Sequence, residues 1–184
     1  MFIIHSLRGV LGLFIGLTLL VPGRVMAQTK EYEIKAVFLY NFARFVEWPT
    51  NAFATTNAPL VIGVLGQDPF GSYLDKTVEH ETVNDRPLVV RRYERVEEVR
   101  DCHILFISSS EKGRLQQTLT GLQHRGILTV GEMEGFASQG GVLRFLTEDN
   151  KIKLRINLEA ARTEHLTISS QLLKLAEIVR SGKD

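Results

Sequence analysis

Residues 60–71 read LVIGVLGQDPFG, and this stretch decides the fold. Its first six residues are all apolar or glycine, which is typical of a parallel strand that is buried on both faces. Gly66 then turns the chain, and Asp68 followed by Pro69 fits the N-cap and the first position of a helix. We therefore predict a strand, a turn and a helix that runs to about Val78.

The same order of elements recurs further along the chain. Short apolar runs predict strands at residues 88–93, 103–108 and 127–130, and Ser108 with Glu111 forms a capping box for a helix that ends at Leu122. Strands that alternate with helices predict a mostly parallel sheet covered on both faces. Only nine residues, 94–102, remain for one crossover that usually needs about a dozen. This leaves open that the strand at 88–93 is misplaced or antiparallel.

The pattern changes in the last third of the chain. Residues 142–147 and 151–157 flank the polar turn Glu148-Asp149-Asn150, and apolar residues alternate with charged ones in the second run. That alternation predicts an antiparallel hairpin with one solvated face. A short helical turn at 158–162 follows, and Ser169 or Ser170 is expected to cap a last helix ending near Arg180. The predicted fold class is α/β, a three-layer sandwich with a mostly parallel sheet and the antiparallel C-terminal hairpin at its edge.

An aromatic helix precedes this sheet. Residues 38–49 read FLYNFARFVEWP and hold five aromatic residues within a helix predicted at 31–48, which Pro49 ends. One face at helical spacing joins Ile34, Val37, Phe38, Asn41, Phe45 and Trp48. The rings pack in a core or contact a partner. Because the helix end returns to the surface and Trp is enriched in interface hot spots, the predicted partner-binding residues are Phe45, Glu47, Trp48 and Pro49.

Residues 1–27 are predicted to be a secretory signal. Arg8 precedes an uncharged run of twelve residues, 10–21, which is short of the about 20 residues that span a bilayer. We expect cleavage after Ala27, export to the periplasm without stable membrane insertion, and one domain at 28–184. The chain has 22 basic and 21 acidic residues, and the signal removes two of the basic ones. This balance argues against nucleic-acid binding.

The motifs of catalysis are mostly absent. GQDPFG and GFASQGG lack the lysine or the hydroxyl residue of a phosphate loop, no G-x-S-x-G elbow occurs, and no histidines stand at metal-ligand spacing. His103 is expected to be a satisfied core residue, and the single cysteine, Cys102, an inert buried thiol. Glu132 and Glu134 flank Met133 and would need a shared pocket for acid–base work. We therefore expect no enzyme, no cofactor and no metal.

Several segments together resemble the YfiR family of periplasmic regulators. They occur in the family's order and cover nearly all of the chain after the signal. The segments are FLYNFARFVEWP (38–49), VLGQDPFG (64–71), CHILFIS (102–108), LTVGEMEGFASQGGVLRF (128–145), INLEAAR (156–162) and LTISSQLLKLA (166–176).

The resemblance implies a function as well as a compact α/β sandwich. Family members bind the periplasmic sensor region of an inner-membrane diguanylate cyclase and keep it inactive, which lowers cyclic di-GMP and biofilm formation. An outer-membrane lipoprotein can sequester the repressor, and homodimers are common. Ligands are described near the segment that here reads Leu166 to Ser170, where Thr167 and Ser169 offer only hydroxyl groups. An alternative from the residues themselves is a small-molecule-sensing module with its ligand at strand ends near Asp68 or Ser108.

Overall fold

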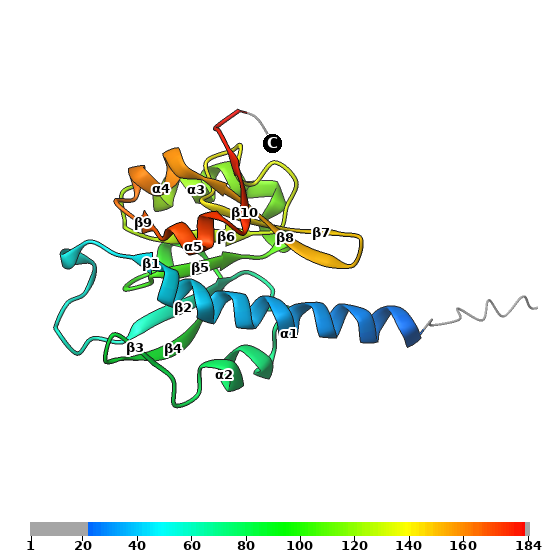
Figure 1. Cartoon of the computed structure of the whole chain (residues 1–184), viewed down its shortest axis with the longest axis horizontal. Helices are drawn as coiled ribbons and strands as arrows, with labels where there is room; N and C mark the ends of the chain where they lie inside the picture. Colours follow the sequence, from blue (N-terminus) through cyan, green and yellow to red (C-terminus); the bar gives the residue numbers. More distant parts are fainter. Residues whose placement is uncertain (1–21, 183–184) are drawn as a thin grey trace, which may run out of the picture.

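The computed structural model describes residues 22–182 (Figure 1). Its strands are β1 (Val46–Glu47), β2 (Leu60–Leu65), β3 (Thr82–Val83), β4 (Arg86–Tyr93), β5 (Ile104–Ile107), β6 (Leu128–Gly131), β7 (Leu143–Glu148), β8 (Lys151–Asn157), β9 (Thr167–Ile168) and β10 (Ala176–Val179). Its α-helices are α1 (Pro22–Phe45), α2 (Ser72–Val78), α3 (Leu115–Leu122), α4 (Leu158–Thr163) and α5 (Ser170–Leu173). Three 3₁₀ helices are η1 (Thr50–Ala52), η2 (Val96–Glu98) and η3 (Ser109–Arg114). Residues 1–21 of the predicted signal lie outside the described part of the chain. Its last residues, 22–27, form the start of α1.

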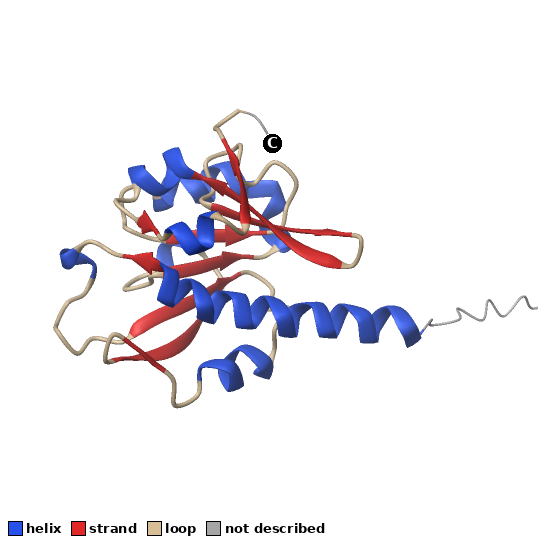
Figure 2. Cartoon of the chain, in the orientation of Figure 1, coloured by secondary structure: helices blue, strands red, loops and turns tan. Residues whose placement is uncertain are grey.

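The predicted fold class is confirmed. Within residues 22–182 the main sheet has eight strands in the order β10-β8-β7-β6-β5-β2-β4-β3, and β1 pairs with β9 in a separate two-stranded sheet. Neighbours from β7 to β4 are all parallel. Helices α1, α2 and α5 cover one face and α3 covers the other, which makes three layers (Figure 2).

The strand that the sequence left in doubt is β4, and it is parallel to β2. Leu60 lies opposite Leu88, and the register continues to Leu65 opposite Tyr93. The chain therefore crosses β2 on its way from β4 to β5 within a short connection. That connection includes η2, and a 3₁₀ helix rises about 2.0 Å per residue against 1.5 Å in an α-helix, so few residues reach further.

The C-terminal prediction was right for the hairpin and wrong for the last helix. β7 and β8 pair antiparallel, with Leu143 opposite Ile156. The hairpin is not outermost, because the chain from Ala176 to Val179 adds β10 parallel to β8. The helix α5 stops at Leu173. Helical spacing of apolar residues was misleading here, since the free edge of β8 offers a backbone partner that outweighs local propensity.

Two predicted helix starts also moved. α2 begins at Ser72 rather than next to Asp68. The Oδ1 atom of Asp68 accepts a hydrogen bond from the Phe70 N–H at 2.7 Å, which closes a local turn instead of capping the helix. Ser108 does act as an N-cap, but it caps η3 through the Ser110 N–H, and α3 follows only from Leu115.

The buried face of α1 differs from the predicted face. Leu39 and Phe42 are fully buried, whereas Ile34 is 44% and Val37 is 48% exposed. The ring of Phe42 stacks on that of Phe145 from β7, with centroids 5.8 Å apart. The helix ends at Phe45, three residues before the predicted end, because the chain continues as β1.

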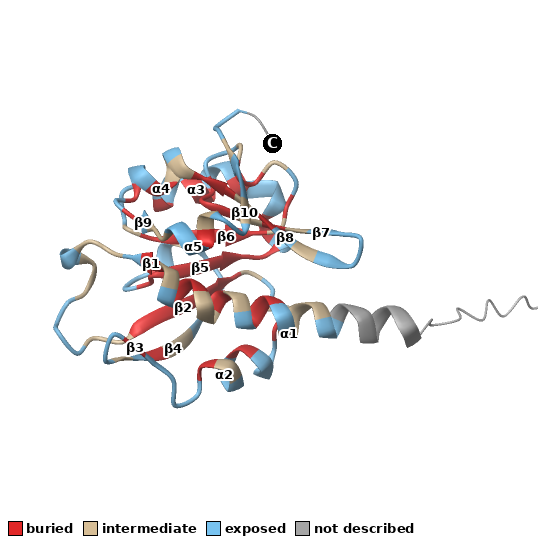
Figure 3. Ribbon diagram, in the orientation of Figure 1, coloured by how far each residue is buried: buried red, intermediate tan, exposed pale blue. Residues whose placement is uncertain are grey.

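The sheet separates two apolar cores, and its central strands are coloured as buried in Figure 3. The larger core lies under α1 and includes Ile62, Phe106 and Phe145. The smaller lies under α3 and includes Leu105 and Phe136. Strands in the middle of the sheet are buried on both faces, as their uninterrupted apolar sequences predicted.

We expect substitutions on the buried face of α1 to destabilise the protein more than substitutions on its exposed face. Phe42→Ala removes a fully buried ring and is expected to lower the free energy of unfolding by about 3–5 kcal/mol. Val37→Ala on the exposed side of the same helix should change it by less than about 0.5 kcal/mol. Urea unfolding followed by the fluorescence of Trp48 measures both. Equal losses in the two variants would contradict the observed packing of α1.

Candidate functional site

A short strand pair joins two segments that sequence reasoning had treated separately. In the β1–β9 pair, Val46 lies opposite Ile168 and Glu47 opposite Thr167. The Ser169 N–H extends the pairing by donating to the Phe45 carbonyl at 2.9 Å. The residues predicted to bind a partner therefore lie beside those of the predicted ligand segment. We call this surface the β1–β9 platform (Phe45, Glu47, Trp48, Pro49, Thr167 and Ser169).

Trp48 is half-buried and held in a defined orientation. Its Nε1–H donates to the His103 carbonyl at 3.2 Å, and its ring meets the His103 ring edge to face at 6.1 Å between centroids. Phe45 and Pro49 are half-buried as well, while Glu47 and Thr167 are exposed. The platform thus presents fixed aromatic surface together with an exposed carboxylate.

His103 supports Trp48 from inside and is a satisfied core residue, as predicted. Its Nδ1 accepts from the Val61 N–H at 3.1 Å, and its Nε2 lies 3.1 Å from the Ala52 carbonyl, so the neutral ring carries its proton on Nε2. The ring stacks on Phe53 at 4.3 Å, and the guanidinium of Arg86 lies 3.8 Å from the Phe53 centroid. Burial lowers the pKa of His103.

A cavity of about 220 Å³ opens beside Trp48. Its lining is mostly apolar, with three polar side chains that come from β1, from the β3–β4 turn and from the start of β4. The lining residues are Ala43, Val46, Glu47, Trp48, Phe53, Leu60, Val83, Asn84 and Arg86. A single apolar side chain of a partner fits a space of this kind.

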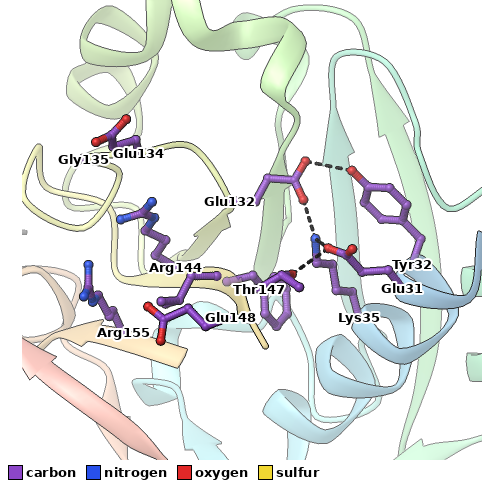
Figure 4. Close-up of a pocket in the computed structure, with 12 residues that line it drawn as sticks. Glu31, Tyr32, Lys35, Glu132, Glu134, Gly135, Arg144, Thr147, Glu148 and Arg155 are labelled. Atoms are coloured by element: carbon purple, nitrogen blue, oxygen red, sulfur yellow. Dashed lines mark hydrogen bonds and ion pairs between the residues drawn. The ribbon is translucent and has the colours of Figure 1, made fainter. Parts of the chain in front are cut away.

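Two further cavities adjoin at the opposite, carboxyl edge of the parallel strands. One of about 340 Å³ lies between the turns that follow β2 and β5, and Asp68 and Ser108 line it. In the sheet, β4 lies on one side of β2 and β5 lies on the other, so the order of the strands reverses at β2. Open α/β sheets bind ligands at such a reversal of strand order. The larger cavity, about 790 Å³, shares Tyr32 and Glu132 with the smaller one (Figure 4).

A buried lysine marks the wall of the large cavity. The side chain of Lys35 is only 3% exposed, and its Nζ lies 2.6 Å from both Glu31 and Glu132. Burial raises the pKa of Glu31, but hydrogen bonds from Lys35 and Thr147 outweigh this and lower it overall. The sequence analysis did not identify Lys35 as a buried residue. The only indication was its position next to Ala36 on a helix that is largely apolar.

Glu132 holds three elements together. It accepts hydrogen bonds from Tyr32 on α1 at 2.8 Å, from Ser109 after β5 at 3.0 Å and from Lys35 at 2.6 Å. Glu134 lines the same large cavity, so the two carboxylates singled out in the sequence share a pocket. Because both oxygens of Glu132 already accept hydrogen bonds from other elements, this residue connects α1 to the loops after β5 and β6 and is poorly placed as a general base.

The far wall of the large cavity carries two arginines. Arg144 of β7 lies directly opposite Arg155 of β8, and both side chains extend toward the space near Glu134 (Figure 4). Arg155 also bonds Glu177 at 2.9 Å. Four carboxylates and three cations line this cavity, so it suits a small and strongly polar ligand rather than an apolar one.

The three residues predicted as a weak ligand site do not converge. Asp68 lies at the carboxyl edge, where it pairs with Arg92 at 2.7 Å. Thr167 and Ser169 lie on the platform beside β1. The Ser169 hydroxyl caps α5 by accepting from the Leu172 N–H at 3.3 Å. A shared site for all three is therefore not formed, and the role of each stays a prediction.

Cys102 is buried, and burial raises the pKa of its thiol to about 12, so it is held as an unreactive thiol. No group of three metal-ligating side chains is found among residues 22–182. In the same part of the chain, no helix combines the length and the apolar character needed to cross a bilayer.

The fold is a small α/β sandwich that carries the β1–β9 platform at one edge of the parallel strands and the two polar cavities at the other. The chain belongs to the YfiR/HmsC-like family, whose profile matches residues 32–177. The family is one of periplasmic regulatory proteins. No curated protein matches the chain.

Two solved structures are similar at low levels. One is the ABC domain in complex with L-Trp from Streptococcus pneumoniae, with TM-score 0.47 and 11% identity over 65% of this chain and 55% of that chain. The other is a conserved domain protein from Vibrio cholerae, with TM-score 0.48 and 12% identity over 64% and 54%. This chain spans about half the length of each.

The buried imidazole under Trp48 predicts a pH dependence. The unfolded chain protonates His103 below a pH of about 6.5, while the folded state resists protonation because its pKa is lowered. Stability is therefore lost as pH falls from about 6.5 toward the lower folded pKa, at up to about 1.4 kcal/mol per pH unit. Urea unfolding at pH 7.5, 6.5 and 5.5 measures this slope.

The matched variants are His103→Gln, which removes the titration, and His124→Gln at an exposed position. The slope between pH 6.5 and 5.5 is expected to shrink in the first and to persist in the second. Carboxylates titrate at lower pH and leave this window clear. An unchanged slope in His103→Gln would show that another group is responsible.

Proposed function

We propose that this protein is a non-catalytic periplasmic regulator that binds the periplasmic region of an inner-membrane diguanylate cyclase and holds it inactive. Lower cyclic di-GMP and less biofilm follow from that inhibition. An outer-membrane lipoprotein that binds the same surface would release the cyclase by sequestering the regulator. Membership in the YfiR/HmsC-like family and the predicted export signal support this proposal.

The observation that carries the proposal is the β1–β9 platform. It combines half-buried Trp48 and Phe45 with exposed Glu47, and an apolar cavity adjoins it. Because Trp48 is anchored by a hydrogen bond and a ring contact, little side-chain entropy is lost when a partner covers it. Central aromatic anchors beside a pocket dominate the energy of protein interfaces.

Inhibition requires a preference between two states of the target. Shifting a two-state cyclase from mostly active to mostly inactive takes about 10⁴-fold tighter binding to the inactive state, or about 5.5 kcal/mol. A few hot-spot residues at about 2 kcal/mol or more each supply this difference. The exposed carboxylate of Glu47 at the polar edge of the platform adds charge selectivity.

A charge reversal at the platform tests this directly. Glu47→Lys changes an exposed side chain, so the fold should be kept while binding to the cyclase's periplasmic region weakens by about 10-fold or more. The matched control is Glu97→Lys on η2, which is equally exposed and lies on the other face of the sheet. Calorimetry or surface plasmon resonance with the purified periplasmic region of a candidate diguanylate cyclase from the same organism gives both affinities.

The same variants are informative in cells. Deleting the gene should raise cyclic di-GMP and surface attachment, and Glu97→Lys but not Glu47→Lys should complement the deletion. Unchanged cyclic di-GMP in the deletion strain with an intact cyclase would overturn the regulator function. Full complementation by Glu47→Lys would overturn the platform as the binding surface.

A second candidate function is small-molecule sensing, and the adjoining cavities at the carboxyl edge favour it. Their lining offers cations, carboxylates and hydroxyls within one groove. Nothing in this arrangement requires a reaction. A ligand bound here would stabilise the folded protein by mass action.

Thermal-shift screening with nucleotides and amino acids tests the groove. A ligand at 100 times its dissociation constant adds about 2.7 kcal/mol and raises the melting temperature by several degrees in a domain of this size. Arg155→Gln on the cavity wall should reduce that rise, whereas Arg180→Gln outside the cavity lining should not. A flat response across the panel would retire the sensing function for these ligand classes.

A further inference from the structure

Two arginines of the β7–β8 hairpin lie side by side on one wall of the large cavity. Arg144 is directly opposite Arg155 in the antiparallel register, so both side chains project from the same face of the hairpin. Like charges that lie directly opposite on adjacent strands are destabilising. Both side chains are half-buried and extend toward the space near Glu134 (Figure 4). The hairpin therefore concentrates positive charge on the cavity wall at a cost to its own stability.

This pair of guanidinium groups suits one anionic group of a ligand. A guanidinium carries five N–H donors in a planar fork that matches the two oxygens of a carboxylate. Arg155 uses its Nε–H for Glu177 at 2.9 Å, and Glu177 lies outside the cavity lining. A carboxylate placed between the two arginines would accept hydrogen bonds from both and offset their mutual repulsion.

The charge of the whole lining limits the ligand to a single negative charge. Four carboxylates against three cations leave the cavity with a net charge of −1. A phosphate ester brings about two negative charges near neutral pH. It would meet the four carboxylates in a partly enclosed space, where like charges repel more strongly than in bulk water. The cavity therefore disfavours nucleotides and favours a carboxylic acid.

The carboxylates of the lining favour hydroxyl groups over an ammonium as further ligand groups. Lys35 already holds Glu31 and Glu132 at 2.6 Å, and Glu148 bonds a lysine of the same hairpin. Glu134 lies beside the arginines, where another cation would be repelled (Figure 4). A ligand ammonium would compete with these cations. A hydroxyl needs no net charge, because each carboxylate has about four lone-pair sites and keeps some for a neutral donor.

The smaller cavity extends the same chemistry. It shares Tyr32 and Glu132 with the large one, and its volume of about 340 Å³ and the about 790 Å³ of its neighbour both fall within the usual range of small-molecule sites. Its lining is rich in hydroxyl groups, which both donate and accept hydrogen bonds. These hydroxyls belong to Thr29, Tyr32, Ser108, Ser109 and Ser110.

We propose that the groove binds an acidic sugar with one carboxylate, in the form of a uronic acid joined to a neutral sugar. The carboxylate lies between Arg144 and Arg155, and hydroxyls of the acidic ring donate to the carboxylates on the α1 wall. The neutral ring occupies the smaller, hydroxyl-lined cavity. This inference rests on the sensing function proposed for the groove and names the class of its ligand.

Matched compounds test the charge and the second ring separately. Isothermal titration calorimetry of the protein purified after export compares D-glucuronate, its methyl ester, a disaccharide of glucuronic acid and a neutral sugar, and maltose. The ester keeps the ring hydroxyls but loses the negative charge, so it should bind at least 10-fold more weakly than glucuronate. The acidic disaccharide should bind at least 10-fold more tightly than glucuronate because it also fills the smaller cavity. Maltose should give no binding.

Variants of the two cavities locate the contacts. Arg144→Gln should weaken glucuronate binding at least 10-fold, whereas Arg180→Gln outside the lining should leave it unchanged. Gln67 is exposed and lines only the smaller cavity. Gln67→Ala should therefore weaken the disaccharide several-fold and leave glucuronate unchanged, and it tests the groove even where Arg144→Gln does not fold. Circular dichroism checks the fold of each variant.

The possible failures are distinguishable from one another. Equal binding of the acid and its ester, or unchanged glucuronate binding in a folded Arg144→Gln variant, would overturn the arginine pair as the carboxylate site. A nucleotide or an amino acid that binds while the acidic sugars do not would overturn this inference and leave the sensing function standing. A flat response to every compound, acidic sugars included, would retire the sensing function together with this inference.

Discussion

The packing of α1 onto the centre of the sheet is the constraint on which the other features depend. Phe42 stacks on Phe145, and Leu39 is sealed beneath the helix. The same helix carries Lys35 to the carboxyl edge of the parallel strands and delivers Phe45 and Trp48 to the amino edge. Ten residues separate Lys35 from Phe45, which is about 15 Å of helix. One rigid element therefore sets the positions of both the groove and the platform.

Apolar packing alone would leave that helix free to turn or slide. The buried side chains of α1 are Ala, Leu and Phe, and they pack on apolar side chains of the sheet. A small rotation or shift of the helix would bury a similar apolar area. Lys35 removes this ambiguity, because its buried ammonium requires Glu31 and Glu132 at 2.6 Å. A displaced helix would carry Glu31 with it but would separate the buried ammonium from Glu132, and breaking a buried ion pair in this way is costly. We interpret the Lys35–Glu132 contact as the device that selects one seating of α1.

Sequence patterns predicted the parts of the fold that depend on burial along one segment. β2 and β5 are recognisable because both faces are buried and every position is apolar. The segment at Ala176–Val179 was misassigned because its fate depends on the free edge of a distant strand, β8. The face of α1 was misjudged for a related reason. Ile34 and Val37 fit an apolar face in sequence, but the sheet contacts the neighbouring stripe through Leu39 and Phe42.

The two candidate sites differ in the same respect, because one is formed mainly by a local segment and the other by distant segments. The platform residues from Phe45 to Pro49 are contiguous, so the local sequence was enough to identify them. The groove is lined by Tyr32, Asp68 and Glu132, which lie far apart in the chain, so no local pattern reveals it. The platform and the groove occupy opposite edges of the strands, so the proposed partner and a small ligand would not compete for the same space. Tyr32 and Lys35 line the groove, and Phe45 enters the platform, so α1 contributes directly to both. A ligand in the groove would affect partner binding at the platform only by displacing α1. The Lys35–Glu132 ion pair resists that displacement, so the free energy needed to break this pair limits the coupling between the two sites.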